Sequence, residues 1–263
     1  MEVAGLTDLD WSVPWLAPLA EIGRPIAASC DWRTALNQAA GAAGACNASG
    51  GRIAFCDAEL AADEPYETFI ARTGRVPTRN NPHDFFNALM FVHFPRAKAQ
   101  LNRLQSQAIA RDGIRAVRGS VRDAATLIDE NAVLLVTERA DVVELLRDHD
   151  WPALFQSGRA EWNREVGVLA FGHALLEKLT QPYKAITAHA LHLALSPRSR
   201  LEEIDRCMAG ALDDRLSPFA LMPLPVLGIP GWWWQNENPD FYSDRTVFRP
   251  AKMRRDRKAE KDL

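Results

Sequence analysis

The stretch Asn81-Pro-His-Asp-Phe-Phe-Asn-Ala-Leu-Met-Phe-Val-His-Phe94 predicts a buried helix with a polar start. Asn81 is a favourable N-cap, and Pro82 fits the first helical position. The second half of the stretch is almost entirely apolar, so this helix has no face suited to water. A helix of this kind belongs in the interior, with other elements packed around it.

The polar side chains at the start of this helix form the main candidate site. At helical spacing His83 and Asn87 share a face, with Asp84 about 100° around the axis. Arg79 and Asn80 lie just before the helix. A histidine and an aspartate beside an arginine suit proton transfer, metal ligation or phosphate binding. We therefore predict catalytic roles for His83, Asp84 and Asn87, and substrate-binding roles for Arg79 and Asn80.

A purely structural explanation of the same residues stays open. Asp84 falls at the third helical position, where it can close a capping box with Asn81. His83 would then only cover the start of the helix.

His173 is predicted to join the site from another element. A long helix is expected over Glu161–Leu179, with His173 on an apolar stripe and Gly172 allowing close approach of another backbone. The next expected helix, Tyr183–Leu195, carries His189. If these two helices are antiparallel, the imidazoles of His173 and His189 approach each other.

Such an arrangement allows a divalent metal, with His83, Asp84, His173 and His189 as candidate ligands. The spacing of the histidines does not require a metal, and the cofactor stays unknown. A hydrogen-bonded core histidine is the structural alternative for His173.

Two further polar groups stand outside this pattern. Asp129-Glu-Asn131 is expected to be the turn of a hairpin between Ala124–Ile128 and Val133–Val136, and its carboxylates either reach the same site or stay solvated. Arg118 and Arg122 could contact an anion, and Arg122 is a predicted substrate-binding residue. A structural ion pair of Arg122 with the adjacent aspartate is the alternative.

The remaining pattern predicts an α+β fold, predominantly helical, with a small antiparallel β-hairpin or sheet and an extended Pro/Trp-rich C-terminal tail packed on the body. Residues 1–250 are expected to form one globular domain, and residues 251–263 a disordered charged tail. The other expected elements are a strand at Ile53–Cys56, a loop over Gly41–Gly51, and helices over Asp31–Ala40, from Asp63 to Gly74, Arg96–Arg111 after a break at Pro95, Asp141–Asp148 and Leu201–Leu216.

Composition narrows the class of protein. The 263 residues carry a formal net charge of −3, which gives no strong signal for a nucleic-acid partner. The four cysteines match no zinc framework, and no stretch has the layout of a signal peptide or the length of a membrane span. We therefore expect a cytoplasmic protein with no membrane association. A small-molecule or phosphate-bearing substrate and a protein partner both stay open.

Several well-known motifs are absent from the sequence. It has no Gly-x-Ser-x-Gly elbow, no Walker lysine and no His-Glu-x-x-His. The His83-Asp84 doublet invites comparison with the all-helical HD phosphohydrolases, which need an upstream histidine. No histidine precedes His83 in this chain, so the comparison fails.

A set of spaced motifs covers nearly the whole chain. They are Val76-Pro-Thr-Arg-Asn-x-x-His-Asp-Phe-Phe-Asn-Ala-Leu89, Phe94-Pro-x-x-Lys-x-x-Leu-Asn-x-x-Gln105, Asp129-Glu-Asn131, Phe171-Gly-His-Ala174 and Gly228-Ile-Pro-Gly-Trp232. With them the sequence resembles the bacterial family known as domain of unknown function 3025. Ala132 departs from the glycine expected after Asp129-Glu-Asn131, which affects only the turn geometry. The resemblance implies one full-length domain of bacterial type and no particular activity.

Two functional hypotheses follow. The first is a hydrolase-like enzyme, metal-dependent or not, built around His83, Asp84, Asn87 and His173, with Arg79 as an anion contact. The alternative is a non-catalytic interaction protein that uses the Trp-rich C-terminal segment. The enzyme hypothesis requires the side chains of His83, Asp84 and His173 to converge on an open cleft.

Overall fold

The predicted buried helix is α4 (Pro82–His93) in the computed structural model, which describes residues 5–6, 8–61, 64–113 and 119–251. Every residue of α4 from Asp84 to His93 is buried. Helices α2 (Trp32–Ala42), α5 (Pro95–Asp112) and α8 (His173–Lys178) pack around it. The apolar sequence of α4 is therefore explained by neighbours on most of its circumference.

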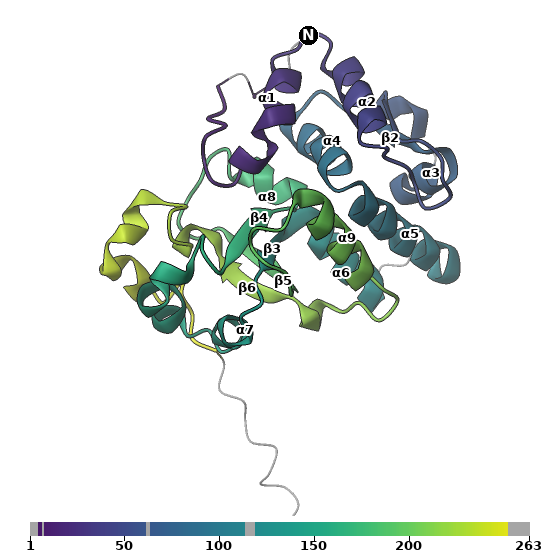
Figure 1. Ribbon diagram of the computed structural model, residues 1–263. Helices are drawn as coiled ribbons and strands as arrows, with labels where there is room; N and C mark the ends of the chain where they lie inside the picture. The colour runs from purple at the N-terminus through teal and green to yellow at the C-terminus, as the bar shows by residue number, and fades with distance from the viewer. Residues whose placement is uncertain (1–4, 7, 62–63, 114–118, 252–263) are drawn as a thin grey trace, which may run out of the picture.

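Helix α5 follows α4 directly along the chain (Figure 1). The break predicted at Pro95 is confirmed, because α4 ends at His93 and α5 begins at the proline, which has no N–H to continue the ladder. Helices α3 (Tyr66–Thr73), α6 (Ser120–Asn131) and α9 (Leu201–Ala211) pack against α5. Two more helices are α1 (Ala20–Ala27) and α7 (Ala140–Arg147).

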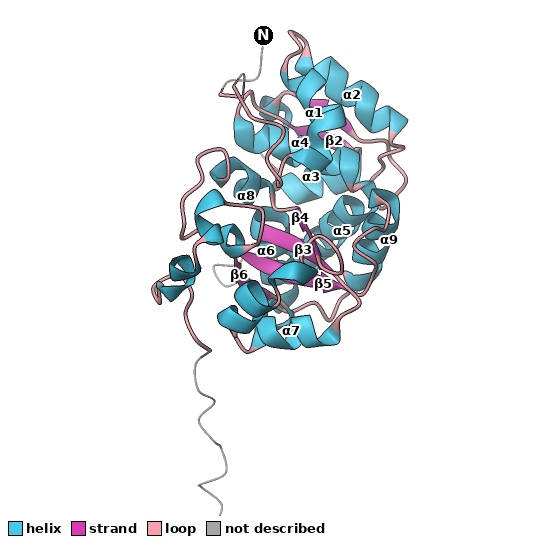
Figure 2. Cartoon of the chain, turned by 60° about the vertical axis from the view of Figure 1, so that its left-hand side comes forward, coloured by secondary structure: helices cyan, strands magenta, loops and turns pink. Residues whose placement is uncertain are grey.

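A four-stranded sheet lies beside these helices (Figure 2). Its order is β4 (Gly167–Ala170), β3 (Ala132–Val136), β5 (Thr187–Leu193) and β6 (Met222–Pro225). Strand β3 pairs parallel with β5, and the two outer pairs are antiparallel. Two shorter strands, β1 (Ala54–Cys56) and β2 (Arg75–Pro77), form a separate parallel pair. The chain is α+β and mainly helical, as predicted, but its larger sheet is mixed.

The hairpin predicted around residues 129–131 is wrong. Ala124–Ile128 lies inside α6, where Ala124, Ala125 and Ile128 face inward at helical spacing. Asn131 ends α6, and Ala132 begins β3 directly. The second half of that prediction, a strand at Val133–Val136, is confirmed as part of β3, which is buried along its whole length.

The helices predicted over Glu161–Leu179 and Tyr183–Leu195 are also wrong. The first range contains β4, a turn at Gly172 and the short helix α8, and the second contains β5. Both ranges are rich in Ala and Leu, and strand pairing with β3 overrides that local helix preference. His189 and His192 accordingly lie on a strand.

Several local predictions are confirmed. Asp31 caps α2 by accepting a hydrogen bond from Thr34 N, although α2 runs on to Ala42, into the predicted loop. Helix α3 ends at Gly74, which has a φ of 70°. Asp63 lies outside the described residues. Helix α9 is shorter than predicted and ends at Ala211.

The C-terminal segment is packed on the body, and its described residues contain β6 as well as several short 3-10 helices. Trp232 is buried, whereas Trp234 is 75% exposed. One hydrophobic core cluster extends from Leu6 to Phe248. Of the predicted charged tail, residues 252–263 lie outside the described residues. No helix in the described part of the chain is long and apolar enough to cross a membrane.

Candidate metal centre and its cavity

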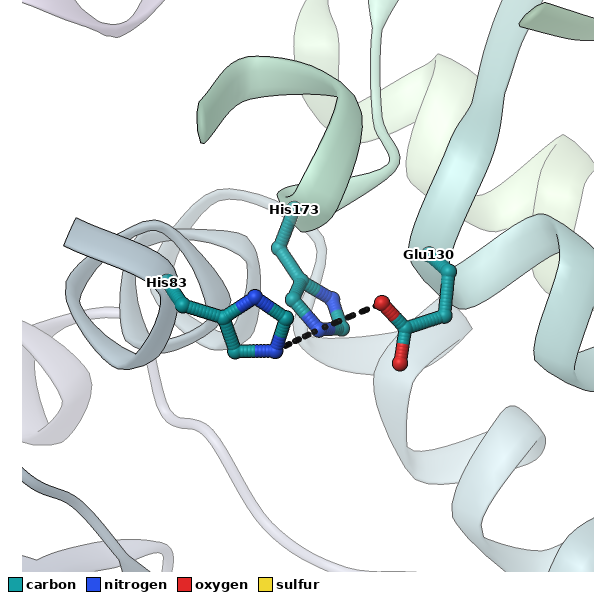
Figure 3. Close-up of side chains that lie close together, drawn as sticks. All are labelled: His83, Glu130 and His173. Atoms are coloured by element: carbon teal, nitrogen blue, oxygen red, sulfur yellow. Dashed lines mark hydrogen bonds and ion pairs between the residues drawn. The ribbon is translucent and has the colours of Figure 1, made fainter. Parts of the chain in front are cut away.

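Two histidines predicted for the site meet in the structure, although 90 positions separate them in the chain. His83 stands in the first turn of α4, and His173 is the first residue of α8. Their Nε2 atoms are 3.1 Å apart. The two rings are nearly perpendicular, at 81°. The packing of α8 on α4 therefore produces a pair of imidazole nitrogens that face each other (Figure 3).

Glu130 completes a group of three potential metal ligands. It lies near the end of α6, and its Oε2 atom is 3.3 Å from His173 Nε2. One donor atom from each of His83, Glu130 and His173 lies within 4.8 Å of the other two. Donor atoms of a tetrahedral zinc site, each about 2.0–2.1 Å from the ion, are about 3.3 Å apart. We call these three residues the His–His–Glu cluster.

Gly172 allows this close approach, as the sequence indicated. A Cβ atom at Gly172 would lie 2.5 Å from Ala132 N, Asn131 N and Glu130 O. All three atoms belong to the backbone and cannot rotate away. Gly172 N also donates a hydrogen bond to Ala132 O. Only a residue without a side chain lets the start of α8 lie against the end of α6, where Glu130 is.

Glu177 fixes the orientation of the His83 ring. Its Oε2 atom lies 2.9 Å from His83 Nδ1. A carboxylate can only accept, so Nδ1 carries the hydrogen, and in the neutral ring Nε2 presents its lone pair to the cluster. A carboxylate on the far nitrogen of a histidine is the usual partner of a metal-ligating imidazole. His83 is therefore prepared to ligate through Nε2.

A cavity of about 450 Å³ opens beside the cluster. All three members of the His–His–Glu cluster line it. Its wall comes from the helical part and the segments beside it: Ala58, Glu64, Tyr66, Glu67, Ile70, Pro77, Arg79, His83, Asp84, Asn87, Phe91, Lys98, Leu101, Asn102, Gln105, Thr126, Asp129, Glu130 and His173. Five of these described lining side chains are carboxylates and two are cationic, so the cavity favours a cation over an anion.

A chain of hydrogen bonds forms the inner wall of the cavity. Lys98, which is 3% exposed, donates to the carboxylate of Asp129 and, over 2.7 Å, to Asn87 Oδ1. Asn87 Nδ2 donates in turn to the hydroxyl oxygen of Tyr66 over 2.8 Å. Burial acts to raise the pKa of Asp129, but the charge of Lys98 and its hydrogen bond hold that pKa below its usual value. We call these four residues the Tyr66–Asp129 chain.

Burial also shifts the pKa values of two members of the cluster, His173 and Glu130. It lowers the pKa of His173 to about 4, against the opposing effect of the nearby Asp129 carboxylate. Burial and the charge of Asp129 together raise the pKa of Glu130. At neutral pH His173 is uncharged, which leaves it able to act as a ligand.

Asn87 and Asp84, the other two site residues predicted on α4, line the cavity but have different partners. Asn87 lines the cavity and is part of the Tyr66–Asp129 chain. Asp84 also lines it, but its carboxylate accepts hydrogen bonds from Arg79 Nε, Nη2 and backbone N. Asn81 caps α4 as predicted, by accepting from Asp84 N. The Asp84 carboxylate is thus engaged by Arg79 and is not part of the His–His–Glu cluster.

The remaining candidates lie outside the ligand group. His189 is on β5, where its Nδ1 atom is 3.4 Å from Asn131 Nδ2. Asn80 and Arg122 are half-buried and do not line the cavity. Arg118 lies outside the described residues. The charge of Arg79, which does line the cavity, is paired with Asp84.

Sequence reasoning gave no role to several residues of the site. From the sequence Glu130 is only a carboxylate that either reaches the site or stays solvated, and no pattern marks Glu177. Lys98, Asn102 and Gln105 stood in a motif without a role, yet they recur on one face of α5 and are all buried. A polar stripe at that spacing, within a helix that also buries Leu101 and Leu104, was the available signal.

A family model described as Protein of unknown function (DUF3025) matches residues 53–252. The chain belongs to this family. The matched region contains every residue that lines the cavity, from Ala58 to His173. No curated protein and no solved structure matches the chain.

Proposed function

We propose that the protein is a metal-dependent hydrolase that binds a divalent transition metal at His83, His173 and Glu130. The observation that carries the proposal is the convergence of two Nε2 atoms and one carboxylate oxygen within 4.8 Å on the wall of a cavity. Two histidines and a glutamate form one of the ligand sets of catalytic zinc sites, in which water occupies the fourth position. The carboxylate of Glu177 on His83 Nδ1 adds the support that such ligands need.

The chemistry is hydrolysis of a bond in a small polar substrate. A metal ion lowers the pKa of its bound water and so supplies a nucleophile near neutral pH. The water oxygen and one of its hydrogens join one fragment of the substrate, and the other hydrogen leaves with the second fragment. The cavity has room for a small molecule, and its excess of carboxylates disfavours a highly charged phosphate.

A bacterial, cytoplasmic setting is part of the proposal. None of the four cysteines, Cys30, Cys46, Cys56 and Cys207, forms a disulfide in the described part of the chain, which suits a reducing compartment. The alternative of an interaction protein has weaker support, because of the three consecutive tryptophans Trp232 is buried, Trp233 is half-buried and Trp234 alone is widely exposed.

The test is metal analysis of the purified protein, reconstituted with Zn²⁺ and dialysed. We expect about one ion per chain in the unaltered protein, as for other sites of this type. His83→Ala, His173→Ala and Glu130→Ala should each lose it while keeping the helical circular dichroism spectrum. His189→Ala is the matched control, since His189 lies outside the cluster, and it should retain the ion. Equal zinc content in all five proteins, or none in any of them, would refute the proposal.

A further inference from the structure

The Tyr66–Asp129 chain has a direction that follows from the chemistry of its members. The ammonium group of Lys98 can only donate hydrogen bonds. Asn87 must therefore turn its Oδ1 atom toward Lys98, at 2.7 Å, and its Nδ2 atom toward Tyr66, at 2.8 Å. The oxygen and nitrogen atoms of the Asn87 amide have similar shapes, but these two hydrogen bonds determine which is which.

Tyr66 is the open end of this chain. Its hydroxyl oxygen accepts from Asn87, so the hydroxyl hydrogen is left to donate elsewhere. Among the described residues no acceptor for that hydrogen is found in hydrogen-bonding geometry, and Tyr66 lines the cavity. A hydroxyl that accepts from a chain polarised by an ammonium ion is a stronger donor than an isolated one. The cavity thus contains an oriented donor without an acceptor.

The Asp129 carboxylate joins this donor to the His–His–Glu cluster. It lies next to Glu130 in α6, and its charge acts on His173 as well as on Tyr66. Burial, with that charge, raises the pKa of Tyr66, so the hydroxyl keeps its hydrogen at neutral pH. An oxygen atom of a substrate bound at the cluster can therefore meet a neutral donor that lines the same cavity.

We propose that the Tyr66 hydroxyl donates a hydrogen bond to the carbonyl oxygen of a carboxylic ester or amide held at the His–His–Glu cluster. This inference rests on the proposed function and narrows its substrate class. A carbonyl oxygen is neutral before reaction and gains negative charge as water adds, which a fixed donor stabilises. A phosphate ester carries negative charge from the start and is best matched by cationic side chains, but both lining cations, Arg79 and Lys98, are already paired with Asp84 and Asp129.

The test uses acetohydroxamate, a small metal-binding compound with a carbonyl oxygen, and inorganic phosphate. Both are titrated calorimetrically into the zinc-loaded protein. Tyr66→Phe removes only the hydroxyl and should weaken acetohydroxamate binding about five- to tenfold, the effect of one lost hydrogen bond, without changing zinc content. The melting temperature should fall, because the buried Asn87 Nδ2 atom loses its acceptor. Phosphate should bind more weakly than acetohydroxamate and be unaffected by the substitution. Tyr183→Phe, at a tyrosine that is 55% exposed and outside the cavity, is the matched control and should bind like the unaltered protein.

Failure of this inference and failure of the metal proposal give different results. Tyr66→Phe protein that keeps its zinc and binds acetohydroxamate as tightly as the unaltered protein would overturn the role of Tyr66 alone. Tighter binding of phosphate would overturn the substrate class. If the unaltered protein holds no zinc, nuclear magnetic resonance of the metal-free protein with ¹³C-labelled tyrosine tests whether the Tyr66 hydroxyl contacts the carbonyl compound. A saturable shift of the Tyr66 signal with acetohydroxamate supports the donor role, and its absence removes it.

Discussion

Gly172→Ala tests how the chain brings its ligands together. The added Cβ atom would lie 2.5 Å from three backbone atoms, in Glu130, Asn131 and Ala132. Carbon contacts of that length are far inside van der Waals distance, so α8 or the end of α6 must move. Overpacking of a tightly packed interior costs about 1–3 kcal/mol, and backbone neighbours place this site at the upper end.

The assay is urea unfolding followed by circular dichroism, together with zinc titration. We expect the free energy of unfolding to fall by about 2–3 kcal/mol, and zinc affinity to fall because His173 moves away from Glu130. Gly210→Ala is the matched control, since a Cβ at this position in α9 meets no atom within 4 Å. It should leave zinc binding unchanged and stabilise the protein by up to about 1 kcal/mol, because alanine is the better helix former. A Gly172→Ala protein as stable as its parent and equal in zinc affinity would refute the reasoning.

Three further predictions concern buried polar groups. Lys98→Met leaves the Asp129 carboxylate without its cation and should reduce the free energy of unfolding by about 3–5 kcal/mol, while the double variant Lys98→Met/Asp129→Leu should recover most of the loss in urea unfolding. Burial lowers the pKa of His93 below its ordinary value of 6.5, so the unfolded chain takes up the proton first as the pH drops. The free energy of unfolding should therefore fall below pH 6.5. In His93→Gln its dependence on pH should be shallower by up to about 1.4 kcal/mol per pH unit. Asp205 accepts hydrogen bonds from the first backbone N–H groups of α5, and Asp205→Ala should lower stability by about 0.5–2 kcal/mol in the same assay, whereas an unchanged midpoint would argue against this cap.

The parts of the fold that were predictable are those in which local signals agree. Asn81 and Pro82 start α4, Pro95 separates it from α5, and Gly74 ends α3, each for a reason that lies within a few residues of chain. Propensity, capping and periodicity gave the same answer there. These signals placed His83 and Asn87 correctly on one face of a helix that borders the cavity.

Only one strand of the larger sheet, at Val133–Val136, was predicted from the sequence, because the strands are stabilised by partners distant in the chain. Strand β3 pairs with β4 and β5, more than 30 residues away, and all of its side chains are buried. A run such as Ala132–Val136 has the same composition as a buried helix, and only its pairing decides. Strand β5 is likewise defined by its pairing, and His189 therefore lies on a strand and not on the expected helix.

The site was partly predictable for the same physical reason. His83 and His173 could be selected because each is a polar group within an apolar stretch, and such a group needs partners. The sequence did not reveal that Glu130, and not Asp84, is the carboxylate of the cluster. That outcome depends on the hydrogen bonds between Arg79 and Asp84 and on α6 ending beside α8. Tyr66 and Lys98 became candidates only when α3, α4 and α5 formed one wall.

The most direct test of the metal centre is a crystal structure of the zinc-loaded protein with diffraction data collected at the zinc absorption edge. We predict one anomalous peak on the cavity wall, within about 2.0–2.2 Å of His83 Nε2, His173 Nε2 and a carboxylate oxygen of Glu130. A peak at the cysteines or at His189, or no peak while the two Nε2 atoms stay in contact with each other, would contradict a metal site at this cluster.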